Sequence, residues 1–132
     1  MATEPVVIRP SDLATDAWDD PTRGRVEFAT VFSGDQTPTD SMVSGFAEVP
    51  AGRDFHVHRH EPAEIYHVLA GEGVVHLDGR EFPVEAGSVV FIPGGSRHGI
   101  HTTSDEPLRL FYVLAADSFG DVTYDFAAES AA

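Results

Sequence analysis

The sequence has no cysteine, no lysine and only eight positively charged side chains, all arginine, against 22 acidic ones. Without cysteine there is no disulfide framework, no thiolate nucleophile, no zinc-thiolate site and no iron–sulfur cluster. Without lysine there is no Schiff-base chemistry. Any bound metal must therefore be held by imidazole and carboxylate groups. The absence of cysteine is compatible with every redox compartment.

Positive charge is also too scarce and too scattered for two classes of partner. The formal net charge is −14, and the arginines are spread from Arg9 to Arg109. Nucleic acids and anionic membranes bind clustered basic side chains, so we expect neither as a partner. No apolar run approaches the roughly 20 residues that span a bilayer, and no basic start leads into an apolar stretch as in a signal peptide. We expect a cytoplasmic protein that handles a small molecule.

The 132 residues predict one domain with an extension at each end. Residues 1–25 carry several prolines and aspartates around a short strand-like stretch at 6–8, so we expect an N-terminal arm. Residues 26–126 form the predicted single domain, and the small residues 127–132 form a predicted flexible tail. The arm and the apolar segment near residues 119–126 suggest that two subunits exchange strand edges, so we predict a homodimer.

From residue 26 onward the pattern is typical of an all-β fold. Short strand-like stretches alternate with turn residues, and no apolar 3.6-residue period persists over ten positions. Asp78 and Gly79 give the strongest hairpin signal, because a type I′ turn needs positive φ at both central positions. Many short strands at nearly regular spacing predict a sandwich or barrel.

The histidines carry the clearest chemical signal. All seven lie between positions 56 and 101. His56, His58 and His60 alternate, so on a strand they would face the same side, and Glu64 follows closely. Three imidazoles crowded on one inward face repel when protonated and lack partners when neutral, which a shared cation relieves.

Two spaced motifs resemble those of the cupin superfamily. The first is Gly52, five residues, His58, one residue, His60, three residues, Glu64, six residues and Gly71. The second is Gly87, five residues, Pro93, one residue, Gly95, two residues, His98, three residues and then Thr102, where the family usually has asparagine. The resemblance covers about residues 40 to 115.

The resemblance implies a double-stranded β-helix, the jelly-roll cupin barrel, with one divalent transition metal per chain. By the same resemblance the metal ligands are His58, His60, Glu64 and His98. Imidazole and carboxylate suit several ions, so we expect iron first, with zinc, manganese, nickel, cobalt or copper as alternatives, and not calcium. Four protein ligands in a six-coordinate site leave about two positions for water, substrate or dioxygen.

Two further residues are candidates for catalysis. His56 lies outside the family ligand pattern, and it is a predicted general base, fifth ligand or partner of a ligand, or else a histidine at the rim. Tyr66 lies two residues after Glu64, so it should share the inward face and donate a proton or orient substrate, unless it only packs in the core. Tyr112 is predicted to line the cavity together with Phe46, Phe91 or Phe111, depending on strand register.

Three functions remain open, because this fold serves many chemistries. The first is a mononuclear metal-dependent enzyme of the non-haem dioxygenase type that oxidises a small organic substrate. The second is redox-neutral chemistry by a lyase, isomerase or polyketide-type cyclase, with the metal as Lewis acid and His56 or Tyr66 moving a proton. The third is a non-catalytic cupin that binds a small molecule or a metal.

Overall fold

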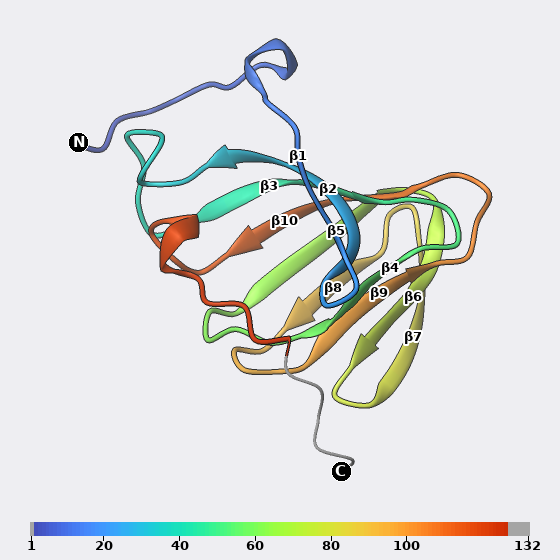
Figure 1. The fold of residues 1–132 in the computed structure, drawn as a ribbon. Helices are drawn as coiled ribbons and strands as arrows, with labels where there is room; N and C mark the ends of the chain where they lie inside the picture. The colour runs from blue at the N-terminus through green and yellow to red at the C-terminus, as the bar shows by residue number, and fades with distance from the viewer. Residues whose placement is uncertain (1, 127–132) are drawn as a thin grey trace.

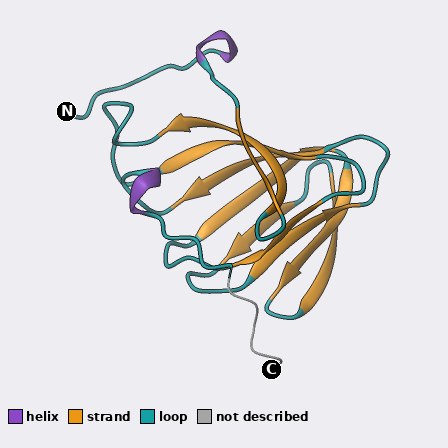
Figure 2. Cartoon of the chain, viewed as in Figure 1, coloured by secondary structure: helices purple, strands orange, loops and turns teal. Residues whose placement is uncertain are grey.

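The computed structural model describes residues 2–126, and strands make up about half of them (Figures 1 and 2). Two short 3-10 helices, η1 (Pro10–Asp12) and η2 (Phe119–Asp121), lie near the two ends of this part of the chain. Its ten strands are β1 (Asp16–Asp20), β2 (Gly24–Phe32), β3 (Val43–Val49), β4 (Asp54–His58), β5 (Glu64–Ala70), β6 (Glu72–Leu77), β7 (Arg80–Glu85), β8 (Val89–Ile92), β9 (His98–Thr102) and β10 (Leu108–Leu114). The predicted flexible tail, residues 127–132, lies outside the described residues.

The strands form one antiparallel sheet that curls round the core. Its order is β7-β6-β9-β4-β2-β3-β10-β5-β8, with β1 added to β2. Between β2 and β4 a single residue pair, Gly24 and Phe55, links the two halves. Figure 1 shows these halves facing each other, so the inner side chains of both share one core. The prediction of an all-β, double-stranded β-helix (jelly-roll) fold is confirmed.

Alternation along the strands decides which side chains enter the core. In β10 the residues Leu108, Leu110, Tyr112 and Leu114 are buried, whereas those between them are more exposed. In β5 the same alternation buries every second residue from Glu64 to Val68. A polar side chain at an inward position of such a strand is therefore held inside the barrel, away from water.

Two glycines are required by the backbone. Asp78 and Gly79 both have positive φ, 48° and 81°, and they connect β6 to β7, which confirms the predicted hairpin. Gly24 has φ +83°, and a Cβ there would lie 2.1 Å from the carbonyl oxygen of Asp54. The sheet halves can approach each other at this joint because Gly24 has no side chain.

The chain ends differ from the sequence prediction. In the N-terminal arm the strand is β1 at Asp16–Asp20, whereas residues 6–8 are not in a strand. Residues 122–126, here called the C-terminal strap, form no regular strand, but Arg59 and Asp125 make a reciprocal pair of backbone hydrogen bonds of 3.0 and 2.9 Å. Both ends therefore pack on the barrel, and the N-terminal arm does so through a strand at other residues than the predicted 6–8.

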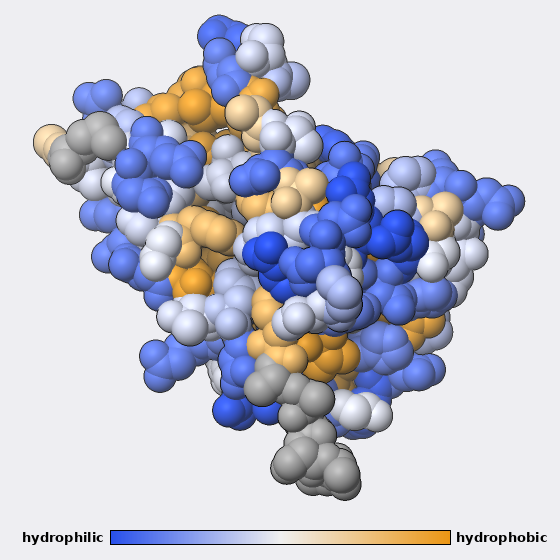
Figure 3. All heavy atoms as spheres, viewed as in Figure 1, coloured by the Kyte–Doolittle hydropathy of each residue, from blue (hydrophilic) through white to orange (hydrophobic). Residues whose placement is uncertain are grey.

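The surface agrees with the acidic composition. The face seen in Figure 3 is mostly hydrophilic, with separate apolar patches. Val89 and Phe91 on β8, the strand at the end of the sheet order, are 66% and 65% exposed. Within residues 2–126, no helix is long and apolar enough to cross a membrane.

Candidate metal centre and its aromatic cavity

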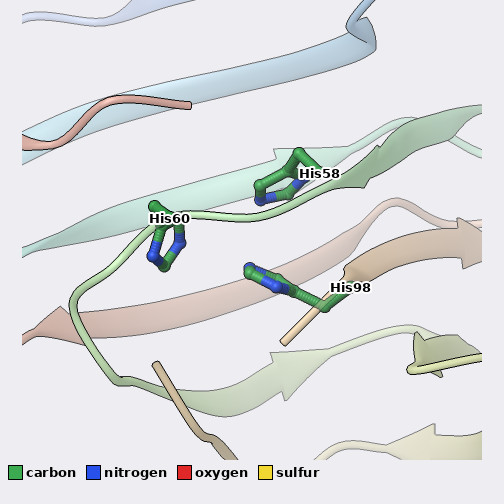
Figure 4. A group of neighbouring side chains, drawn as sticks. All are labelled: His58, His60 and His98. Carbon is green, nitrogen blue, oxygen red and sulfur yellow. The ribbon is translucent and has the colours of Figure 1, made fainter. Parts of the chain in front are cut away.

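Three histidines from two segments of the barrel turn toward a common space (Figure 4). His58 ends β4 and His98 begins β9, and the two residues are paired across the sheet. His60 follows shortly after β4, and Glu64 is the first residue of β5. The two sequence motifs therefore meet in space, because β4 of the first motif pairs with β9 of the second.

The cluster is compact and buried. One ring nitrogen from each of the three histidines lies within 4.8 Å of the others. His58 and His98 are 0% exposed, His60 is 3% and Glu64 is 4% exposed. Glu64 Oε1 lies 3.1 Å from His60 Nε2 and 3.2 Å from His98 Nε2. Ligand atoms around one transition metal are about 3 to 4 Å apart, so the spacing suits a shared ion.

Backbone carbonyls determine which nitrogen of each ring carries the proton. The Nδ1 atoms of His58, His60 and His98 lie 2.8 to 2.9 Å from the carbonyl oxygens of residues 56, 62 and 96 respectively. A carbonyl oxygen only accepts, so each Nδ1–H must donate. In the neutral rings Nε2 then carries a lone pair, and all three lone pairs belong to the cluster. This is the arrangement that orients histidine as a metal ligand.

The surroundings of His58 test whether the cluster fits a metal ion. Its Nε2 is buried and has no hydrogen-bond partner. Burial first, and then the neighbouring His98, lower the pKa of His58 well below its usual 6.5, so the ring is neutral. A buried lone pair without a partner is costly, so the residues present fit a divalent transition metal.

His56 does not join this cluster. The pairing of β4 with β9 shifts register between Phe55 and His58, which interrupts the strict alternation expected for the three histidines. His56 Nδ1 lies 3.1 Å from the carbonyl oxygen of Thr22, in the turn between β1 and β2. A catalytic role for His56 stays a prediction, and its described contacts lead away from the other histidines.

Tyr66 lies on the buried face of β5 with Glu64 and is 3% exposed. Burial first, and then the charge of Glu64, raise the pKa of Tyr66 well above its usual 10, so its phenol holds the proton in the metal-free chain. Its ring centroid is 6.1 Å from that of His98. Tyr66 therefore lies beside the cluster, and its catalytic role stays a prediction.

A cavity lined mainly by aromatic side chains adjoins the cluster. Its lining includes Trp18, Phe55, Glu64, Tyr66, Tyr112 and Tyr124. Tyr112 lies there as predicted, and its buried hydroxyl has no hydrogen-bond partner. The three phenylalanines considered with it do not line the cavity; Phe91 is 65% exposed and Phe46 packs against Phe111 instead. The pairings of β10 with β3 and of β8 with β5 place these residues, which alternation alone left open.

Sequence reasoning missed the contribution of the two chain ends. Tyr124 in the C-terminal strap has its ring centroid 5.2 Å from His58 and 5.1 Å from His60. Its centroid is also 5.1 Å from that of Trp18 in β1. The only sequence signals were an isolated tryptophan in an acidic stretch and the alternation of Val122, Tyr124 and Phe126.

Comparison with known proteins agrees with this geometry. The cupin domain model matches residues 45–114. The chain is 38% identical to the dimethylsulfoniopropionate lyase DddW of Ruegeria pomeroyi, over 84% of this chain and 72% of that protein. It is 33% identical to an oxalate-binding protein of Thermotoga maritima, over 70% of this chain and 77% of that protein.

Solved structures give the same answer. A crystal structure from Thermotoga maritima, described as a predicted oxalate decarboxylase, superimposes with a TM-score of 0.74 at 29% identity, covering 84% of this chain and 99% of that one. The family match spans all four ligand-type side chains. Motifs, fold and relatives therefore agree, and this chain belongs to the cupin family.

Proposed function

We propose that this protein is a metal-dependent lyase that removes a proton from a small organic carboxylate and expels a leaving group. The observation that carries the proposal is the buried phenol of Tyr66, which shares an inward face with Glu64 beside three histidines. The 38% identity to a dimethylsulfoniopropionate lyase supports the same class of reaction. That compound is therefore the first substrate to test.

Four side chains would hold the metal: the Nε2 atoms of His58, His60 and His98, and the carboxylate of Glu64. A divalent cation there would polarise a bound carboxylate and offset the negative charge of Glu64, which raises the pKa of Tyr66. The backbone carbonyls that accept from each Nδ1–H keep the three rings in the required orientation.

The elimination balances with Tyr66 as the proton acceptor. Before the reaction the Tyr66 phenol loses its own proton to solvent. The phenolate oxygen then takes the proton from the carbon next to the substrate carboxylate, and the electron pair of that C–H bond forms the new C=C bond. The bond between the adjacent carbon and the leaving group breaks, and the leaving group keeps its electron pair. From dimethylsulfoniopropionate the products are acrylate, dimethyl sulfide and one proton. The apolar cavity excludes water from the exchange.

The decisive experiment is turnover with defined metals. The chain is loaded in turn with Fe²⁺, Mn²⁺, Co²⁺, Ni²⁺ and Zn²⁺, metal content is measured, and acrylate and dimethyl sulfide are quantified by NMR and gas chromatography. We expect Tyr66→Phe to lower kcat about 100-fold or more at unchanged metal content. Tyr112→Phe, a buried tyrosine on the neighbouring strand, is the matched control and should retain turnover. Equal rates for Tyr66→Phe and the parent chain would remove the proposed base.

Oxygen chemistry is the competing function. The iron dioxygenase that the sequence favoured needs open coordination positions, and four protein ligands leave room for them. Oxygen uptake by the Fe²⁺ form, with a panel of phenols, thiols and diketones, tests it. Stoichiometric oxygen consumption with no elimination product would replace the lyase assignment by this one. Isomerase or cyclase activity, or tight ligand binding without any product, are the remaining outcomes of the same panel.

Two coarser expectations stay predictions. A homodimer formed through the chain ends predicts twice the monomer mass by light scattering at micromolar concentration, and a monomeric mass would contradict it. The cytoplasmic location predicts that the protein stays with the soluble cytoplasmic fraction when its cells are separated into compartments.

A further inference from the structure

Part of the cavity wall comes from segments that the family match does not cover. The match spans residues 45–114. Four aromatic residues of the cavity lie outside that span, and we call them the aromatic cage: Trp18 of β1, Phe28 of β2, Phe119 of η2 and Tyr124 of the C-terminal strap. The common barrel therefore supplies the histidine cluster, while the chain ends supply the wall beside it.

Trp18 connects the rings of the cage. Its centroid lies 5.1 Å from Tyr124 and 5.2 Å from Phe28, both edge to face, and 6.4 Å from Phe119. Phe28 and Phe119 stack at 6.1 Å. Aromatic faces carry partial negative charge, so rings round a cavity attract a cation that comes within about 6 Å of them.

The Trp18 ring already attracts one cation. The guanidinium of Arg23 lies 4.6 Å from its centroid and is held there by an ion pair of 2.7 Å with Asp20. Arg23 does not line the cavity, so its guanidinium lies outside the space that the cage borders. Trp18 is therefore in an environment that tolerates positive charge beside the ring.

The charged residues of the cavity also indicate which class of ligand it favours. Among the described residues that line the cavity, none is basic, and Glu64 is the one acidic side chain. The chain has no lysine and a net charge of −14. A head group rich in N–H or O–H donors would find few acceptors among rings. A methylated sulfonium or quaternary ammonium has positive charge and no such donors, so aromatic walls satisfy it fully.

We propose that the aromatic cage binds the methylated onium group of the substrate while the carboxylate at its other end reaches the histidine cluster. This rests on the proposed function and names its substrate class: a carboxylate joined to a sulfonium or quaternary ammonium by a short aliphatic spacer. Tyr124 is the cage residue next to the cluster, with centroid distances of 5.1 Å to both Trp18 and His60. A short spacer therefore spans the distance from cage to cluster.

The single tryptophan allows a direct test without turnover. The full chain, as purified and after chelator treatment, is titrated with trimethylsulfonium chloride while Trp18 fluorescence is recorded, at constant ionic strength. We expect a saturable change with the onium salt and none with sodium chloride. tert-Butanol, a neutral compound of similar size, should bind at least five-fold more weakly. Equal affinity for the neutral compound would overturn the proposal.

Variants of the cage locate the site. Tyr124→Leu and Phe119→Leu should each weaken trimethylsulfonium binding about five-fold or more. Phe46→Leu is the matched control, because Phe46 packs against Phe111 and Arg109 outside the cavity and should leave the affinity unchanged. Circular dichroism verifies folding of each variant. Unchanged affinity in both folded cage variants contradicts the cage.

The experiments distinguish a failure of the proposed lyase function from a failure of the proposed aromatic cage. Onium binding by the cage with no elimination product in any metal form would retain the cage and reject the lyase. Elimination from dimethylsulfoniopropionate, with no fluorescence response to trimethylsulfonium and no rise in KM for Tyr124→Leu, would retain the lyase and reject the cage.

Discussion

Replacing His58 by leucine should separate metal binding from folding. The ring is 0% exposed and its Nε2 has no partner, although Nδ1 donates to the carbonyl of His56 at 2.8 Å. A buried orphaned polar atom costs about 1–3 kcal/mol, and an ordinary hydrogen bond contributes about 0.5–1.5 kcal/mol. Leucine has a similar volume and removes both terms. We therefore expect the free energy of unfolding of the metal-free variant to stay equal or rise by about 1 kcal/mol.

With metal bound, the parent chain should be more stable than His58→Leu. A ligand at 100 times its Kd stabilises the folded state by about 2.7 kcal/mol, which the parent chain should show on addition of a divalent transition metal. His58→Leu should show little of this gain. Urea unfolding with chelator and with metal measures both quantities. His67→Leu, on the exposed face of β5, is the matched control and should respond to metal as the parent does.

Two results would refute this reasoning. Metal stabilisation of His58→Leu equal to that of the parent would mean that His58 is not a ligand. A loss of more than about 3 kcal/mol in the metal-free variant would mean that the ring has a structural role that its described contacts do not explain.

Acid should destabilise the metal-free chain. Burial and the neighbouring histidines lower the pKa of His58, so below about pH 6.5 only the unfolded chain takes up that proton. The free energy of unfolding therefore falls as pH drops below this value. Urea titrations at several pH values measure it, and a flat profile from pH 7 to 5 would contradict the neutral ring. Alkali acts with the opposite sign: burial raises the pKa of Tyr112 to about 12 and that of Tyr66 well above 10, so stability is complete below pH 10 and is lost as pH rises further. Tyrosine absorbance near 295 nm should rise together with unfolding, and ionisation of both groups in the folded chain at pH 10 would disprove their burial. Gly24→Ala places a Cβ 2.1 Å from a backbone oxygen and should lower the free energy of unfolding by about 2–4 kcal/mol. Gly52→Ala has open space round the new Cβ, so it should lose only the cost of its positive φ, about 1 kcal/mol. Thermal unfolding compares the two, and equal losses would count against the tight joint.

The hairpin and the ligand spacing show what local sequence predicts well. Asp78 and Gly79 adopt the positive φ values that their residue types allow, because turn geometry depends on two adjacent residues. The ligand motif also keeps a short spacing, so His58, His60 and Glu64 converge once their strands form. His98 joins them because β9 pairs with β4. The resemblance to the family motifs implied that His98 joins the other ligands, whereas local strand propensity did not.

His56 shows where strand alternation fails. A period of two assumes an unbroken ladder, and the register shift between Phe55 and His58 changes which side chains point inward. The aromatic positions show the same limit. Tyr112 lines the cavity while Phe91 is 65% exposed, a difference set by the register of strands far apart in the sequence.

The sequence by itself determined the class of fold, the family resemblance, the exclusion of thiolate and lysine chemistry, and a group of residues able to bind a metal. These properties depend on residue types, short spacings and local turns. Only the tertiary structure decided that three Nδ1–H groups are held by carbonyls, that His56 lies apart, and that Trp18 and Tyr124 from opposite chain ends meet beside the histidines. Contacts of this kind join residues up to about a hundred positions apart. They follow from how the sheet closes and where the ends pack, which no local pattern encodes.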